Sequence, residues 1–247
     1  HRRYNRFSSC SLLRPRLERK RAHRKLHADL FLGPDLARTH TIKHNTVAVV
    51  TDGSSILGLG NLGALAALPV MEGKAILLKE FAGIDGFPIC LDTQDTEEII
   101  ATITRIAPVF GAIHLEDISS PRCFEIETRL RKLLPIPVMH DDQHGAAMVV
   151  LAGLINAFKV RGIKKEDAKI VVNGAGAAGT AITHMLLDYG VQDVTACDID
   201  GVIGEGRHAL ALSPLVVGLD QFFAPRGVFG IQHLHVLQQI QAHFTDG

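Results

Sequence analysis

The feature that most constrains the fold is a glycine-rich turn between a strand-like segment and a helix-like segment. Gly174-Ala-Gly-Ala-Ala-Gly179 follows the apolar segment 168–173 and leads into a helical pattern over residues 177–189. A second apolar segment, 194–198, comes after the helix. Strand, glycine turn, helix and strand in this order form the unit that binds dinucleotides in Rossmann-type domains. We therefore predict an α/β fold with a parallel sheet in this part of the chain.

The residues of the turn predict a nucleotide site that prefers NAD. Glycines let backbone amides approach a pyrophosphate at the helix N-terminus, where the helix dipole favours negative charge. A carboxylate at the end of the second strand accepts hydrogen bonds from the ribose and repels the extra phosphate of NADP. The predicted cofactor-binding residues are Gly174, Gly176, Ala177, Ala178, Gly179 and Asp198. The alternative is a tight turn that binds no nucleotide.

Two pairs of acidic residues, Glu116-Asp117 and Asp141-Asp142, each follow a short apolar segment. Such segments are typical of buried strands of a parallel sheet, so we expect both pairs at strand C-terminal ends, where open α/β sheets bind ligands. Converging carboxylate oxygens suit a hard divalent cation, Mg²⁺ or Mn²⁺. The alternative for each pair is capping of the following helix. Neither pair has the histidine or cysteine spacing of a structural zinc site.

Periodicity and turn residues divide the chain into three parts. We expect residues 1–34 to be a disordered basic segment, 35–160 to form a first α/β domain, and 163–247 to form a partial nucleotide-binding domain. The strands expected in the first domain are 46–51, 87–91, 111–115 and 137–140. Acidic residues within 93–98 predict a helix N-terminus. A long apolar helix, 145–158, is expected to lead into the second domain.

Composition narrows the cellular setting. The chain has 47% apolar residues, 21% charged residues and a formal net charge of zero. It has no uninterrupted apolar stretch long enough to cross a bilayer, so we expect no membrane partner. Cys10, Cys90, Cys123 and Cys197 show no paired spacing, which is typical of reduced thiols. We therefore expect a cytoplasmic protein.

Seven runs between about residues 35 and 207 resemble malic enzymes of the bacterial NAD-linked type. They are TIKHNTVAVVTDG at 41–53, LGLGNLG at 57–63, LPVMEGK at 68–74, KEFAGID at 79–85, EDIS at 116–119, HDDQHG at 140–145 and VVNGAGAAG at 171–179. The resemblance implies a two-domain α/β fold, in which a parallel-sheet N-terminal domain is followed by an incomplete Rossmann-type NAD-binding domain.

The resemblance also implies a reaction and a set of functional residues. The reaction is oxidative decarboxylation of malate to pyruvate and CO₂ with reduction of NAD, and it depends on Mg²⁺ or Mn²⁺. Lys74 matches the general base of the family, which we expect to be neutral because of burial or neighbouring cations. Asp141 matches an auxiliary catalytic aspartate, and Glu116, Asp117 and Asp142 match the metal ligands. The family further implies a homodimer or a higher homo-oligomer.

The two ends of the chain depart from the family pattern. No Tyr-Thr/Ser-Pro-Gly-Val motif, which supplies the general acid in the family, precedes residue 41, and the resemblance fades after about residue 207. Residues 1–27 hold ten Arg and Lys against one acidic residue. A transit peptide and a nucleic-acid arm are alternatives for this basic start, although we do not expect nucleic-acid binding. We expect both ends to come from an incomplete or misread coding frame. The alternative function is a catalytically impaired fragment that binds only nucleotide and metal.

Overall fold

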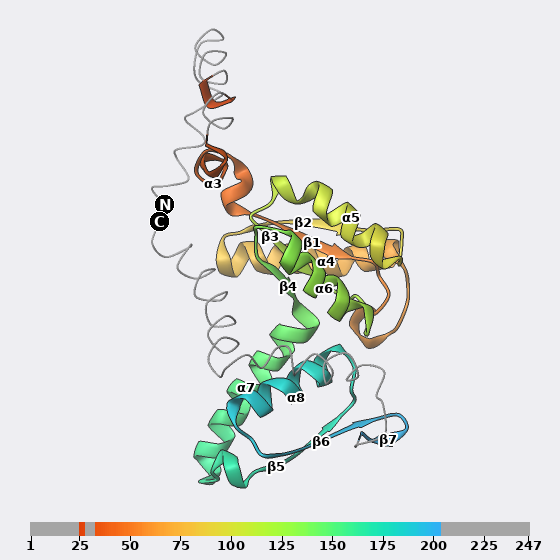
Figure 1. Ribbon diagram of the computed structural model, residues 1–247, viewed down its shortest axis with the longest axis vertical. Helices are drawn as coiled ribbons and strands as arrows, with labels where there is room; N and C mark the ends of the chain where they lie inside the picture. The colour runs from red at the N-terminus through yellow and green to blue at the C-terminus, as the bar shows by residue number, and fades with distance from the viewer. Residues whose placement is uncertain (1–24, 28–32, 204–247) are drawn as a thin grey trace.

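The structure is a computed structural model that describes residues 25–27 and 33–203. Nearly all of the basic segment 1–34, and all of the chain after residue 207, therefore lie outside the described residues. Two sheets are present in the described part of the chain (Figure 1). One has four strands in the order β2-β1-β3-β4, and the other has three in the order β5-β6-β7.

The first sheet is parallel throughout. Its strands are β1 (Thr46–Thr51), β2 (Asp85–Cys90), β3 (Ala112–Leu115) and β4 (Val138–His140). All six residues of β1 are buried, as expected for a central strand covered on both faces. Ala48 and Val50 belong to the main hydrophobic core. The alternate side chains of β1 point to the opposite face, and helix α4 (Ala64–Ala82) contacts both β1 and β2.

Two further helices, α5 (Thr96–Ile106) and α6 (Arg122–Leu133), pack against each other and contribute isoleucines to the same core. The predicted start of α5 is confirmed, because the Asp95 side chain accepts a hydrogen bond of 2.9 Å from the Glu98 backbone N–H. Short helical segments complete the first half of the chain: η1 (Pro34–Leu36), α3 (Ala37–His40), η2 (Ile42–Asn45), η3 (Ile56–Gly58) and η4 (Ala107–Val109).

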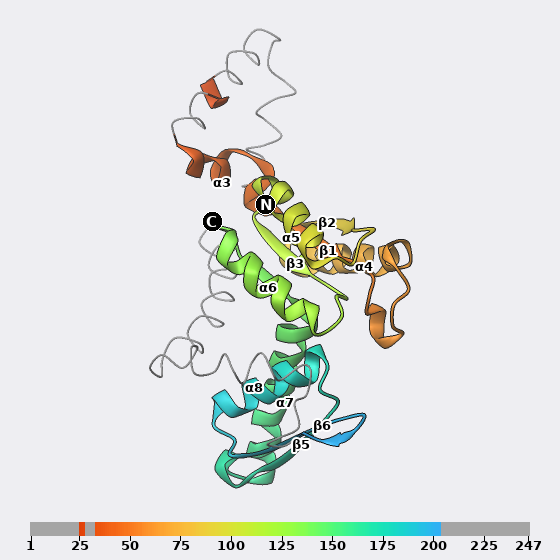
Figure 2. The ribbon, with the colours of Figure 1, turned by 45° about the vertical axis from the view of Figure 1, so that its right-hand side comes forward.

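The long helix α7 (Asp141–Arg161) connects the two sheets (Figure 2). It begins four residues earlier than the predicted 145–158, because Asp141 and Asp142 occupy its first turn, where the helix dipole favours negative charge. Its N-cap is His140 and that of α6 is Pro121, and neither makes a side-chain capping bond. The capping alternative for the two acidic pairs is therefore wrong.

By length and composition, α7 is also the one helix in the described ranges that could cross a membrane. Only 11% of its most apolar stretch is buried. We expected no apolar stretch of that length from the sequence. The difference arises because Asn156 and Lys159 interrupt the apolar run, whereas the alanines, valines and leucines around them keep the mean hydropathy of the helix high.

The second sheet contains the predicted strand-helix-strand unit. β5 (Lys169–Asn173) and β6 (Asp193–Asp198) are parallel, and α8 (Ala177–Tyr189) connects them. β7 (Gly201–Val202) pairs with β6 in the antiparallel direction, and η5 (Lys165–Asp167) precedes β5. The small core of this half, which includes Leu186 and Val191, also contacts Leu154 and Phe158 of α7. The α/β fold class predicted from the sequence is thus confirmed.

Candidate active site

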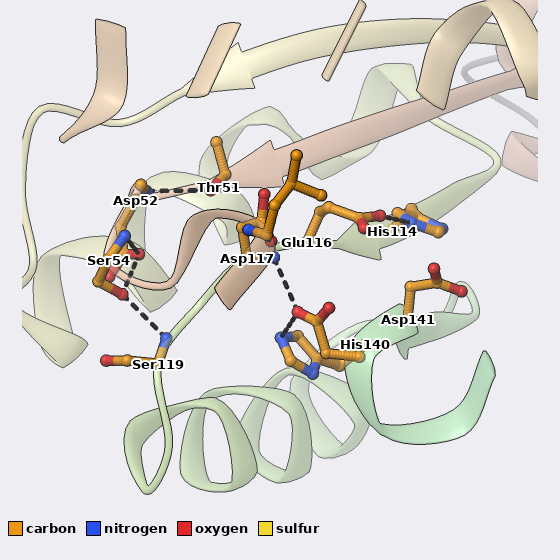
Figure 3. Close-up of polar contacts among 12 residues, drawn as sticks. Thr51, Asp52, Ser54, His114, Glu116, Asp117, Ser119, His140 and Asp141 are labelled. Atoms are coloured by element: carbon orange, nitrogen blue, oxygen red, sulfur yellow. Dashed lines mark hydrogen bonds and ion pairs between the residues drawn. The ribbon is translucent and has the colours of Figure 1, made fainter. Parts of the chain in front are cut away.

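The C-terminal ends of β3 and β4 bring the two acidic pairs together. The two strands are adjacent and parallel, so residues that follow them meet at one edge of the sheet. Glu116 and Asp117 follow β3, and Asp141 and Asp142 form the first turn of α7. Ligand oxygens of Glu116, Asp117 and Asp142 all lie within 4.8 Å of one another. Figure 3 shows Glu116 and Asp117 facing the start of α7.

An unusual backbone conformation aims Asp117 at this group. Its φ is +54°, which typically costs about 1–3 kcal/mol for a residue other than glycine. Its backbone N–H donates to Asp142 Oδ2 at 2.9 Å, and its Oδ1 accepts from the Leu57 N–H at 3.2 Å. Its Oδ2 is buried without a hydrogen-bond partner. An unpaired buried carboxylate oxygen is costly unless a cation binds it.

Burial and mutual repulsion raise the pKa of two of these carboxyls. Burial raises the pKa of Asp142 to about 6, together with the charges of Glu116 and Asp117. Burial also raises the pKa of Asp117, and the charge of Glu116 adds to the effect. Three carboxylates that repel one another and offer only oxygen donors fit a hard divalent cation such as Mg²⁺ or Mn²⁺.

Lys74 lies beside this group, on α4. Its Nζ is 2.8 Å from Asp141 Oδ2 and 3.2 Å from Glu116 Oε2. Burial lowers the pKa of Lys74, but the hydrogen bond to Asp141 and the charges of both carboxylates outweigh burial, so the pKa is raised. This direction is opposite to the one expected for a neutral lysine. The groups closest to the ammonium are anions, whereas that expectation required neighbouring cations or dominant burial.

A buried network beneath the site was not predicted from the sequence. Asp52, which follows β1, is 1% exposed. Its Oδ2 accepts from Arg122 Nη2 at 2.9 Å, and its Oδ1 accepts from the Ser54 hydroxyl at 2.5 Å. The Ser54 hydroxyl in turn accepts from the Ser119 backbone N–H at 2.9 Å (Figure 3). This network ties the loop after β1 to the segment that carries Asp117.

His114 was also missed, although it contacts Glu116. It occupies an interior position of β3, and its ring Nε2 lies 2.6 Å from Glu116 Oε2. The available signal was a polar residue inside an otherwise apolar strand, two positions before a carboxylate. Alternate residues of a strand share a face, so this spacing could have indicated a contact.

The glycine turn has the geometry that a nucleotide turn requires. Gly174 has a φ of +109°. A Cβ at Gly179 would lie 1.7 Å from the Gly174 carbonyl oxygen, whereas Gly176 faces open space. Ala177 and Ala178 are the first residues of α8, whose N-terminus has no side-chain cap. Asp198 ends β6 and accepts from the Asp200 backbone N–H at 2.9 Å.

The fold and the site together define a class of α/β protein with two sheets. One sheet carries a group of carboxylates suited to a divalent cation, and the other carries a glycine-rich turn of the kind that binds dinucleotides. Comparison with known families is consistent with that class. The malic enzyme N-terminal domain matches residues 34–99 and 93–131, and the malic enzyme NAD-binding domain matches residues 143–200. The chain belongs to the malic enzyme family.

Individual relatives agree with the family. The chain is 62% identical to the NAD-dependent malic enzyme of Geobacillus stearothermophilus over 69% of this chain and 36% of that protein. It is 46% identical to the NADP-dependent malic enzyme of Haemophilus influenzae over 70% of this chain and 23% of that protein. The crystal structure of the NAD-dependent malic enzyme from Thermotoga maritima superposes with a TM-score of 0.73 at 49% identity, covering 75% of this chain and 49% of that chain. The chain thus spans less than half the length of these relatives.

Proposed function

We propose that this chain carries the malate- and metal-binding part, and a portion of the NAD-binding part, of an enzyme that converts malate to pyruvate and CO₂ with reduction of NAD. The observation that carries the proposal is the position of Lys74 Nζ, in contact with Asp141 and Glu116. A lysine beside a group of carboxylate ligands supplies both the acid-base chemistry and the cation site that this reaction requires.

Glu116, Asp117 and Asp142 would hold the divalent cation. When bound there, Mg²⁺ or Mn²⁺ supplies Lewis-acid chemistry at oxygens of the substrate. The unpaired Asp117 Oδ2 and the 4.8 Å limit on the distances within the group support this assignment.

In this proposal Lys74 Nζ accepts the proton of the C2 hydroxyl of malate. Because its pKa is raised, the lysine must first release its own proton to solvent water. Asp141 then holds the ammonium that forms when Nζ takes up the hydroxyl proton. Groups that transfer protons in this way typically contribute about 10²- to 10⁴-fold to a rate. Glu116 contacts the lysine and belongs to the ligand group, so it links the two parts of the site.

NAD is the proposed redox cofactor. Its pyrophosphate would lie at Gly174, Gly176 and Gly179, where the uncapped N-terminus of α8 offers backbone N–H groups. Asp198 at the end of β6 would accept hydrogen bonds from the ribose and disfavour NADP. Relatives of both cofactor types are similar to this chain, so the carboxylate is the observation on which the preference rests.

The alternative is a catalytically impaired fragment that binds nucleotide and metal only. The carboxylate group and the glycine turn would by themselves account for both kinds of binding.

Calorimetric titration with Mn²⁺ tests the site on which the proposal depends. We expect the chain to bind Mn²⁺, and Asp142→Ala to weaken binding by more than the ~10- to 100-fold typical of losing an outer hydrogen-bond partner. Asp92→Ala removes an exposed aspartate that follows β2 and is the matched control. Equal affinity in Asp142→Ala would rule out the assignment. Malate-dependent NADH formation then separates the two functions, because only the impaired fragment lacks it.

A further inference from the structure

His114 is a buried histidine beside the candidate site, and the chemistry proposed above gives it no role. It is 7% exposed, and its Nε2 lies 2.6 Å from Glu116 Oε2 (Figure 3). Because an ionised carboxylate only accepts hydrogen bonds, this contact places the proton on Nε2. We propose that His114 is a positioning residue that holds Glu116 so that its other oxygen, Oε1, binds the divalent cation. The inference rests on the proposed function.

The sheet holds the histidine ring in place. β3 lies between β1 and β4, and His114 pairs with Val49 on one side and Met139 on the other. The Glu116 backbone N–H donates to the Val50 carbonyl at 2.9 Å, so the extended pairing continues past the end of β3. Residues two apart in an extended chain share a face. The pairing within the sheet therefore fixes the backbone of both residues, and this places the His114 ring next to the Glu116 carboxylate.

Lys74 makes this restraint necessary. Its Nζ lies 3.2 Å from the same Glu116 oxygen, Oε2. The histidine and the lysine both contact Oε2 of Glu116. In this proposal, Oε1 is left to bind the cation. Without the histidine, the carboxylate can rotate toward the ammonium and pair with it through both oxygens. Cation binding would then compete directly with that ion pair.

His114 could instead be a metal ligand, since ligand atoms of His114, Glu116 and Asp141 also lie within 4.8 Å of one another. The ammonium of Lys74 already contacts both carboxylates of that group, at 3.2 Å and 2.8 Å. A metal ion there would have to displace one positive charge with another. The geometry therefore favours a hydrogen-bond donor over a ligand at His114.

Two substitutions at His114 distinguish the effect of its hydrogen-bond donor from the effect of ring packing. His114→Phe keeps a flat ring and removes the donor, whereas His114→Gln places an amide N–H at about the reach of Nε2. Ile113→Val is the matched control, because it alters a buried neighbour on the opposite face of β3. Mn²⁺ affinity and stoichiometry are measured by calorimetry on the full chain, and the melting temperature is measured with excess chelator and with saturating Mn²⁺.

We expect one Mn²⁺ per chain, ~10- to 100-fold weaker binding in His114→Phe, and affinity close to that of the unmodified chain in His114→Gln and Ile113→Val. The shift of melting temperature on adding Mn²⁺ should shrink only in His114→Phe. If that variant does not fold, His114→Asn, whose amide is too short to replace Nε2, makes the same test.

Unchanged Mn²⁺ affinity in His114→Phe overturns the inference and leaves the proposed function intact. Two bound ions, one of them lost in His114→Phe, would identify His114 as a ligand and also overturn it. Failure of the unmodified chain to bind Mn²⁺ would instead remove the proposed metal site itself.

Discussion

The pKa of Asp142 makes cation binding depend on pH. Burial raises that pKa to about 6, together with the charges of Glu116 and Asp117. A divalent cation binds the ionised carboxylate, so protons compete with Mn²⁺ once the pH falls below the pKa. We expect the Mn²⁺ affinity of the unmodified chain to fall about tenfold between about pH 7 and pH 5, and to change little above pH 7. Calorimetric titrations across this range measure the effect, and a constant affinity contradicts the raised pKa.

The carboxylate of Asp198 should decide between NAD and NADP. Like charges in contact repel by about 1 kcal/mol in water and by more near a protein surface, which corresponds to about fivefold or more in affinity. Asp198→Ser should therefore narrow the preference for NAD by at least that factor. Asp193→Ser, at the opposite end of β6, should leave it unchanged. Fluorescence titrations with both reduced cofactors provide the measurement. Tighter binding of NADPH than NADH by the unmodified chain would show that the assignment is wrong.

The candidate site could be predicted from the sequence only where its signals are local. Each acidic pair directly follows its own apolar segment, so the pattern itself indicates a strand end. Lys74 has no such signal, because a lysine in a helix is ordinarily solvated and its partner Asp141 lies 67 positions away. Only the family resemblance pointed to it. The direction of its pKa shift could not be predicted either, because the sequence did not show that two carboxylates contact its Nζ.

Among the elements, the turn between β5 and α8 depends on the absence of a side chain at Gly179. A Cβ there would lie 1.7 Å from the Gly174 carbonyl oxygen, so backbone must move to admit it. Gly179→Ala should cost about 1–3 kcal/mol or more, as overpacking does. Gly153→Ala is the control: it lies within α7, where a Cβ would have nothing within 4 Å, and it should stabilise by about 0.5–1 kcal/mol. Urea unfolding measures both, and equal midpoints for the two variants would show that the turn is not close-packed.

The elements themselves were largely predictable, because each is specified by its own periodicity and turn residues. The segments expected at 46–51 and 177–189 coincide with β1 and α8. The start of α7 was missed because Asp141 and Asp142 were assigned to the end of a strand, although the first turn of a helix also accommodates acidic residues. Neither the sheet order β2-β1-β3-β4 nor the antiparallel β7 could be predicted, because both result from contacts between distant segments.

At the scale of the whole molecule, the two sheets differ in how well they are covered. All six residues of β1 are buried, whereas no residue of β5 is fully buried and Val171 is 68% exposed. Amide protection reflects the burial and contact density of each region. We expect β5 and β6 to exchange their amide protons faster than β1 and β3, and the chain to aggregate through its exposed apolar residues. Hydrogen exchange followed by mass spectrometry measures the difference in exchange rates. Equal protection of the two sheets would contradict the first prediction, and a monodisperse sample would contradict the prediction of aggregation.

The same division between sheets separates two chemical activities of the proposed enzyme. Lys74 and the carboxylate group lie at the edge of the first sheet, whereas the glycine turn belongs to the second. Loss of CO₂ from oxaloacetate needs only the first group, but conversion of malate also needs a well-placed nicotinamide. We therefore expect Mn²⁺-dependent decarboxylation of oxaloacetate to survive better in this chain than malate-dependent NADH formation.

Lys74→Ala should reduce the decarboxylation about 10²- to 10⁴-fold. Lys79→Ala, which alters an exposed lysine of the same helix, should not. Comparison of pyruvate and NADH formation tests the prediction, and it fails if malate is converted as fast as oxaloacetate or if Lys74→Ala has no effect.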